Sequence, residues 1–227
     1  MSPKSPPLVR LSTIYLFGYN LIQLIGFSNV VYYLCHSLFS DQPKGLITGK
    51  QIYSTISTRF IFFQGLQSIE IVHTLIGLTR GSPLIPLVQI GGRNLILHLC
   101  INCFTSQHGQ WFVLWLLLVW SAIEIFRYSF YLTSIVGFKI KLITFLRYTI
   151  WVPLLPSGII LEAITIYYSV NLLETSGKWS ISLPNQANFS FHLPTLCRLY
   201  LNLLIVPVSY LLLSHMYRQS RKALSSM

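Results

Sequence analysis

The chain has 227 residues, of which 53% are hydrophobic and only 9% are charged. Soluble domains carry about 25% charged residues, so the composition excludes an ordinary soluble protein and favours an all-α polytopic membrane protein. The net charge of +11 could suggest nucleic acid. The cations are spread along the chain without forming a basic helix that faces solvent. We therefore expect the lipid bilayer as a partner and no nucleic acid.

Six apolar stretches are long enough to cross the roughly 30 Å of hydrocarbon in a bilayer. They predict a six-transmembrane-helix bundle that forms a single membrane domain over residues 1–227, with no room for a separate soluble domain. The predicted spans lie near residues 12–39, 52–79, 84–104, 111–134, 142–171 and 193–216.

The distribution of Lys and Arg predicts the orientation of this bundle. Six spans place both termini on one side of the membrane, and the loops on that side carry most of the cations. Both termini are therefore predicted to be cytosolic, and the glycosylation sequon at Asn188 would face the lumen. The predicted cytosolic side holds Lys4, Arg10, Arg80, Arg93, Lys139, Lys141, Arg218, Arg221 and Lys222, and the other side holds Lys44, Lys50 and Lys178.

Three of the five acidic residues lie inside predicted spans, namely Glu70, Glu124 and Glu162. A charge at the centre of a membrane helix costs roughly 2.5–3.5 kcal/mol even on the mildest scales. Each of these carboxylates therefore needs a partner or a function inside the bundle.

Two of the carboxylates have a partner of suitable chemistry three residues later. Glu70 precedes His73 and Glu124 precedes Arg127, and this spacing places each pair on one helix face. Each pair has two interpretations: a buried structural contact, which we favour, or a pocket wall that orients a substrate. Two phenols that follow Arg127 in the sequence share the second interpretation; they are Tyr128 and Tyr131.

Glu162 differs because no cation lies within one helical turn of it. Its partner must come from another span, from water or from a substrate, and a carboxyl group in an apolar pocket can act as a general acid or base near neutral pH. The same stretch contains Pro153, Pro156 and Gly158, which can break or kink a helix. We therefore interpret residues 147–162 as the floor of a polar pocket, with Arg147 and Tyr148 at its edge.

Three segments carry a resemblance to a known family. They are SIEIVHTLIGLTRGSPLIPLVQIGGRN, WSAIEIFRYSFYL and LRYTIWVPLLPSGIILEAITIYY, and together they resemble the 3-hydroxyacyl-CoA dehydratases, also called protein-tyrosine-phosphatase-like or PASTICCINO-like proteins. The resemblance covers nearly the whole chain. It implies a six-span protein of the endoplasmic reticulum that dehydrates very-long-chain (3R)-3-hydroxyacyl-CoA to trans-2-enoyl-CoA. It also implies no metal, no cofactor and association with other fatty acid elongation enzymes.

The family assigns catalysis to the Tyr and Glu of a Tyr-Pro-x-Gly-x-x-x-Glu pattern. This chain matches the pattern at Pro156, Gly158 and Glu162 but has Leu155 in place of the Tyr. Leucine cannot move a proton, so a catalytically impaired relative that binds acyl-CoA or scaffolds elongation enzymes is the alternative to an active dehydratase. Tyr148 is no obvious substitute, because fourteen residues span roughly 21 Å of straight helix. Tyr128 and Tyr131 could replace the phenol only if the bundle brings them to Glu162.

The resemblance also suggests how a substrate would lie. The acyl chain would pack among apolar helix faces, and the CoA end would emerge on the cytosolic side. There its phosphates could meet cations that are otherwise ordinary positive-inside anchors. The phosphatase-like name has no support in the sequence, because none of the four cysteines is followed six residues later by Arg. A small transporter is a third interpretation, but no inverted repeat is visible. The candidate phosphate-binding cations are Arg80, Arg93, Lys139, Lys141 and Arg147.

Overall fold

The structure is a computed structural model that describes residues 11–39, 46–79, 81–138, 140–184, 186 and 188–225. It confirms the all-α membrane fold. The α-helices are α1 (Leu11–Phe39), α2 (Leu46–Gln67), α3 (Ile69–Leu75), α4 (Leu84–Leu95), α5 (Trp111–Val136), α6 (Lys141–Thr149), α7 (Trp151–Ser176), α8 (Leu193–Leu199) and α9 (Ile205–Leu224). Two π-helical turns, η1 (Ile96–Ile101) and η2 (Tyr200–Leu204), continue α4 and α8, and a short hairpin pairs β1 (Ser180–Ile181) with β2 (Phe191–His192).

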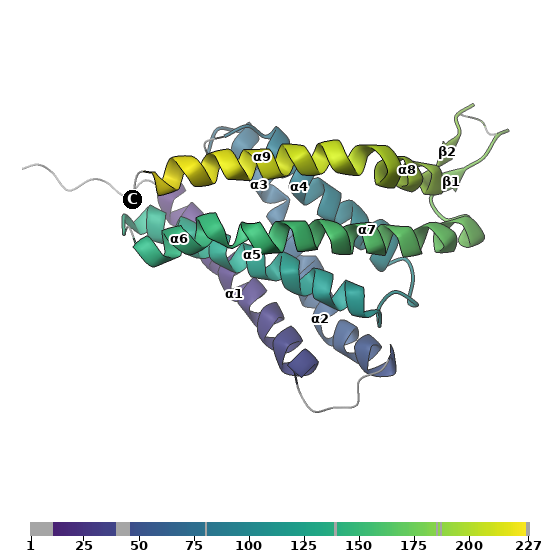
Figure 1. Cartoon of the computed structure of the whole chain (residues 1–227), viewed down its shortest axis with the longest axis horizontal. Coiled ribbons are helices and arrows are strands. Elements are labelled where there is room, and N and C mark those ends of the chain that lie inside the picture. Colours follow the sequence, from purple (N-terminus) through teal and green to yellow (C-terminus); the bar gives the residue numbers. More distant parts are fainter. Residues whose placement is uncertain are drawn as a thin grey trace, which may run out of the picture.

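The chain runs back and forth along the bundle, with the beginning of α1 and the end of α9 at the same end (Figure 1). Five helical segments in the described part of the chain are long and apolar enough to cross a membrane, and α2 is not among them. This helix carries Lys50, Gln51 and Arg59 among several Ser and Thr residues, which lowers its hydropathy. The other segments are Leu11–Phe39, Leu84–Ile101, Trp111–Val136, Lys141–Ser176 and Leu193–Ala223.

Pro153, Pro156 and Gly158, which can break or kink a helix, do not break it here. The break lies at Ile150, between α6 and α7, and α7 runs through both prolines. Pro153 is the third residue of α7, where a helix has backbone N–H groups without intrahelical partners, so a proline is tolerated there. Pro156 lies inside the helix. Residues 147–162 therefore form the end of one helix and the first half of the next.

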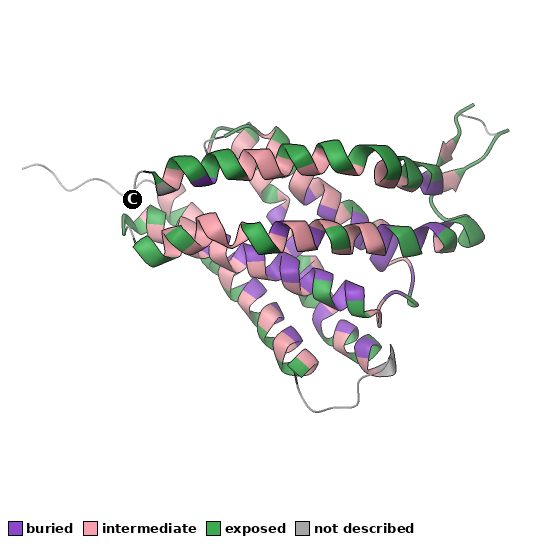
Figure 2. Cartoon of the chain, viewed as in Figure 1, coloured by how far each residue is buried: buried purple, intermediate pink, exposed green. Residues whose placement is uncertain are grey.

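The core lies around α5, which packs against α1, α2, α6 and α7. Trp120 and Tyr128 of α5 are among the largest fully buried side chains. Figure 2 shows buried residues concentrated on α5 and on the faces turned toward it, while α9 is mostly exposed or intermediate. Val206 and Tyr210 of α9 are 71% and 72% exposed. Apolar side chains exposed to this extent suit a helix that faces lipid tails.

Candidate active site

The carboxylate of Glu124 lies between two guanidinium groups in the centre of the bundle. One oxygen of Glu124 is 2.6 Å from Nη1 of Arg93 on α4, and the other is 2.7 Å from Nη2 of Arg127, one turn further along α5. All three residues are buried. The expected ion pair between Glu124 and Arg127 is therefore present, and Arg93 adds a second cation from a neighbouring helix.

Arg127 also joins Glu70 to this cluster. Its Nη2 atom is 2.7 Å from Oε1 of Glu70, and Tyr128 donates a hydrogen bond to the same oxygen. Tyr19 of α1 donates a longer one, at 3.4 Å. Glu70 of α3 thus accepts from two phenols and one cation. Tyr131 lies at the edge, with the Arg127 guanidinium carbon 5.9 Å from its ring centre.

The expected pairing of Glu70 with His73 is wrong, since each takes a different partner among the described residues. The ring Nε2 of His73 lies 2.9 Å from the hydroxyl of Tyr15. His73 and Glu70 do share a face of α3, because Tyr19 contacts both: its ring centre is 5.0 Å from that of His73. The i, i+3 spacing predicted the face correctly. The partner was missed because the phenols of α1 and the Arg127 side chain reach this face from other helices.

Glu162 of α7 lies apart from the ion pairs and is held by a neutral donor. The indole Nε1 of Trp120 donates a hydrogen bond of 2.7 Å to its Oε1 atom. The guanidinium of Arg93 is 5.6 Å from the centre of the Trp120 ring and attracts the Glu162 carboxylate electrostatically. Glu162 therefore adjoins the cluster through Trp120 but has no salt bridge among the described residues.

Leu155, two turns before Glu162, is buried and lines a small cavity of about 30 Å³. Glu124, Arg127 and Arg147 line the same cavity. A side chain at position 155 thus faces the ion-pair cluster, and the family's phenol would point toward Glu124 and Arg127. Of the expected pocket over residues 147–162, Arg147 and Leu155 line this cavity, whereas Tyr148 and Glu162 do not.

The remaining candidate residues lie nearer the end of the bundle. Arg147 lines the small cavity, whereas the ring of Tyr148 packs edge-on against Phe130 with centres 5.6 Å apart. No described contact joins Tyr148, Tyr131 or Tyr128 to Glu162. Two of the candidate phosphate-binding cations, Arg80 and Lys139, lie outside the described residues.

Arg93 corrects two expectations at once. We counted it as a cytosolic loop cation and as a candidate for CoA phosphates, but it is 5% exposed within α4 and bound to Glu124. The signal was available in the sequence. Arg93 is a lone cation inside a predicted span, and the reasoning that demanded a partner for the carboxylates applies equally to it.

Two further residues near Glu162 were missed. Trp120 lies four residues before Glu124, a spacing that places both on one face of α5, but tryptophans are common in apolar spans and give no specific signal. Tyr200 of η2 packs against the core cluster that contains Trp120, and its phenol lies within electrostatic range of Glu162. Nothing in the sequence places either residue near Glu162, because Trp120 lies 42 positions before it and Tyr200 lies 38 positions after it.

These features define a class: a helical membrane protein with a cluster of paired charges in its core and one further carboxylate beside it. Residues 64–226 match the family described as protein tyrosine phosphatase-like protein, PTPLA. The chain belongs to this family. No solved structure matches it.

Several curated proteins are similar to the chain over almost all of its length. A very-long-chain (3R)-3-hydroxyacyl-CoA dehydratase from Gallus gallus is 36% identical over 98% of this chain and 60% of its own length. Dehydratase 3 from Homo sapiens is 33% identical over 92% of this chain and 56% of its own length, and human dehydratase 2 is 31% identical over 95% and 82%. The chain thus spans about 60% of the length of the first two relatives.

Proposed function

We propose that the chain dehydrates very-long-chain (3R)-3-hydroxyacyl-CoA to trans-2-enoyl-CoA in fatty acid elongation. The observation that carries this proposal is the environment of Glu162. It occupies the family's Glu position and is held by an indole N–H, whereas Glu70 and Glu124 are both ion-paired. The names of the relatives support the same reaction.

The elimination needs one base and one acid. The base removes a proton from Cα of the thioester, the electron pair forms the new double bond, and the β-hydroxyl leaves as water once an acid has protonated it. Glu162 can fill one of these roles, since a carboxyl group without a cationic partner can exchange a proton near neutral pH. The proton balance of the reaction is closed without a metal or a cofactor.

The paired residues then serve as the frame of the site. In this proposal, the ion pairs among Glu70, Arg93, Glu124 and Arg127 fix α3, α4 and α5 relative to one another. The same side chains form the polar wall of the substrate pocket. His73, Tyr128 and Tyr131 extend that wall. Arg147 and Tyr148 lie where the substrate's polar end would emerge.

Leu155 favours one specific alternative, a relative that binds acyl-CoA or scaffolds elongation enzymes without turnover. Its buried isobutyl group faces the small cavity lined by Glu124 and Arg127 and supplies no proton there. The two functions differ in a single measurable property, which is turnover.

The test is a dehydration assay on the purified chain with 3-hydroxyacyl-CoA substrates of several lengths. Turnover by the wild type that falls in Glu162→Gln supports the dehydratase. Binding without turnover, with turnover gained in Leu155→Tyr, supports the alternative. The extra atoms of Tyr could overpack the site by about 1–3 kcal/mol, so monodispersity of that variant is checked first. Turnover that survives Glu162→Gln would refute the assignment of the acid–base residue.

We further propose that the chain lies in the endoplasmic reticulum membrane as one domain, with both termini in the cytosol and with elongation enzymes as partners. Support comes from the bias of Lys and Arg and from the shared location of the described chain ends (Figure 1). Protease added to intact microsomes should digest tags at both termini and spare a tag between residues 172 and 192. Protection of one terminal tag alone would mean an odd number of spans.

A further inference from the structure

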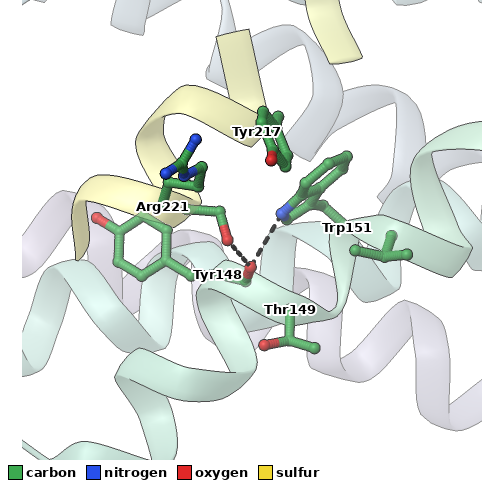
Figure 3. Close-up of a pocket in the computed structure, with 7 residues that line it drawn as sticks. Tyr148, Thr149, Trp151, Tyr217 and Arg221 are labelled. Atoms are coloured by element: carbon green, nitrogen blue, oxygen red, sulfur yellow. Dashed lines mark hydrogen bonds between the residues drawn. The ribbon is translucent and has the colours of Figure 1, made fainter. Parts of the chain in front are cut away.

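A cavity of about 580 Å³ opens between the α6–α7 junction and α9. Cavities of roughly 300–1,000 Å³ are typical of sites for small molecules and cofactors. Figure 3 shows Tyr148, Trp151, Tyr217 and Arg221 around it. Three aromatic rings and one cation therefore meet in one hollow, at the end of the bundle where α9 ends (Figure 1).

The walls of this cavity are fixed by hydrogen bonds that cross between helices. The carbonyl oxygen of Tyr148 accepts a hydrogen bond of 2.9 Å from Nε1 of Trp151 and one of 2.6 Å from Oγ of Ser220 on α9 (Figure 3). The helix break at Ile150 leaves that carbonyl available, because the next helix begins at Trp151. The two hydrogen bonds thus join α6, α7 and α9 at the wall of the cavity.

Trp151 is a wall of two cavities. It lines the large one, and it lines the small one that holds Leu155, Glu124 and Arg127. The two cavities are therefore neighbours. Arg147 lines the small one and Arg221 lines the large one.

We propose that this cavity binds the phosphorylated end of an acyl-CoA, with Arg221 on a phosphate and the aromatic rings along the adenine and the pantetheine arm. The inference rests on the proposed function for the identity of the ligand. The chemistry matches on both counts, because guanidinium groups bind phosphates in bidentate fashion and aromatic rings stack on bases. The acyl end would pass Trp151 toward Leu155 and Glu162.

The first test changes the charge. Binding of a long-chain 3-hydroxyacyl-CoA to the full chain in nanodiscs should weaken about tenfold in Arg221→Gln, as expected for the loss of one charged hydrogen-bond partner. Arg218→Gln is the matched control, since Arg218 is exposed on the same helix and does not line the cavity. Equal affinities of the two variants would overturn the proposal.

The second test changes the volume. Val152 lines the cavity and is 54% exposed, so Val152→Trp should fill the space without disturbing the core. Ile160, 59% exposed on the same helix and outside the cavity, gives the control Ile160→Trp. We expect weaker binding only in Val152→Trp.

A phospholipid headgroup shares the phosphate chemistry of CoA, and competition separates the two sources. Free coenzyme A should displace the ligand from nanodiscs of phosphatidylcholine, and adding 20–30% phosphatidylserine, as a rough range around a common anionic-lipid content, should not. Displacement by the anionic lipid alone would assign the cavity to lipid. Binding that depends on Arg221 in a chain without turnover would refute the proposed function and support this site. Turnover with an unchanged KM in Arg221→Gln would support the proposed function and refute this site.

Discussion

Glu124 lies on α5 and Glu162 on the neighbouring helix α7, and the two carboxylates differ in the groups that contact them. Glu124 has a guanidinium on each oxygen, at 2.6 Å and 2.7 Å. Glu162 accepts one hydrogen bond from the neutral indole of Trp120. Two cations contact Glu124, whereas Glu162 is held by a neutral donor and has no salt bridge among the described residues. Glu124 is buried and Glu162 is partly buried. Under the proposed function, the charge of the partner is what marks Glu162 as the catalytic carboxylate.

The numbers of carboxylates and guanidinium groups in the core also single out Glu162. The described core holds three carboxylates, Glu70, Glu124 and Glu162, but only two guanidinium groups in contact with them, Arg93 and Arg127. Arg127 serves two carboxylates at once. One carboxylate is in excess, and Glu162 is the one without a salt bridge.

The largest expected effect comes from removing the shared cation. Arg127→Met leaves Glu70 and Glu124 facing each other without their common partner, and the loss of one member of a buried ion pair typically costs about 3–5 kcal/mol. We expect a much lower melting temperature and little monodisperse protein in detergent. The control is Arg198→Met. Arg198 contacts Glu174 at 2.6 Å, but the two side chains are 55% and 32% exposed.

An exposed ion pair contributes only about 0–1 kcal/mol, so Arg198→Met should melt close to the wild type. Similar melting temperatures of the two variants would show that the buried cluster is not structural. The division between Glu124 and Glu162 would then lose its basis.

The next effect separates the two carboxylates directly. Glu162→Gln keeps an oxygen that can accept the Trp120 hydrogen bond but removes the titratable group. Turnover should fall by about 100-fold or more, as for the loss of general acid–base catalysis, with little change in melting temperature. Glu124→Gln should clearly lower the melting temperature, because two guanidinium groups lose their anion. Full turnover in Glu162→Gln would exclude it from the mechanism.

The contrast between these residues also shows how far the sequence could predict the site. The long apolar helices, the carboxylates inside the bundle and the pairing of Glu124 with Arg127 follow from local rules: hydropathy and the i, i+3 spacing. The prediction of α2 as a span is not supported by its hydropathy. The partners Arg93 and Trp120 come from packing between helices that are distant in sequence. The break at Ile150 escaped prediction because a proline near a helix start is compatible with the helix, so Pro153 gave a misleading signal.

A smaller effect tests whether another phenol replaces the one missing at Leu155. Tyr200 lies within electrostatic range of Glu162, on a π-helical turn that packs against α7. Such turns are frequent at functional sites. If Tyr200 supplies the proton, Tyr200→Phe should lower turnover by at least about tenfold, with water replacing part of its role.

The matched control for this prediction is Tyr167→Phe, because Tyr167 of α7 is 67% exposed and lines neither cavity. Adding Leu155→Tyr to Tyr200→Phe should restore turnover, since the family's phenol returns. If each Phe variant turns over substrate as fast as the wild type, no phenol is required. The variants are those of Tyr128, Tyr131, Tyr148 and Tyr200.

The smallest effect tests packing far from both carboxylates. Gly49 of α2 lies against the loop before α5, and a Cβ atom added there would be 2.5 Å from the backbone oxygen of Gly109. Backbone on both sides leaves little room to move, so Gly49→Ala should cost about 1–3 kcal/mol through overpacking. Gly65 of the same helix has no atom within 4 Å of such a Cβ. Gly65→Ala should therefore be neutral or stabilising by up to about 1 kcal/mol, because alanine favours a helix over glycine.

The melting temperature measures both changes, and turnover per folded molecule should be unchanged in both, because neither residue contacts the charged cluster or Glu162. A loss of turnover in Gly49→Ala without a loss of stability would mean that the packing of α2 controls the site, and the contrast between Glu124 and Glu162 would no longer be explained by their immediate partners alone.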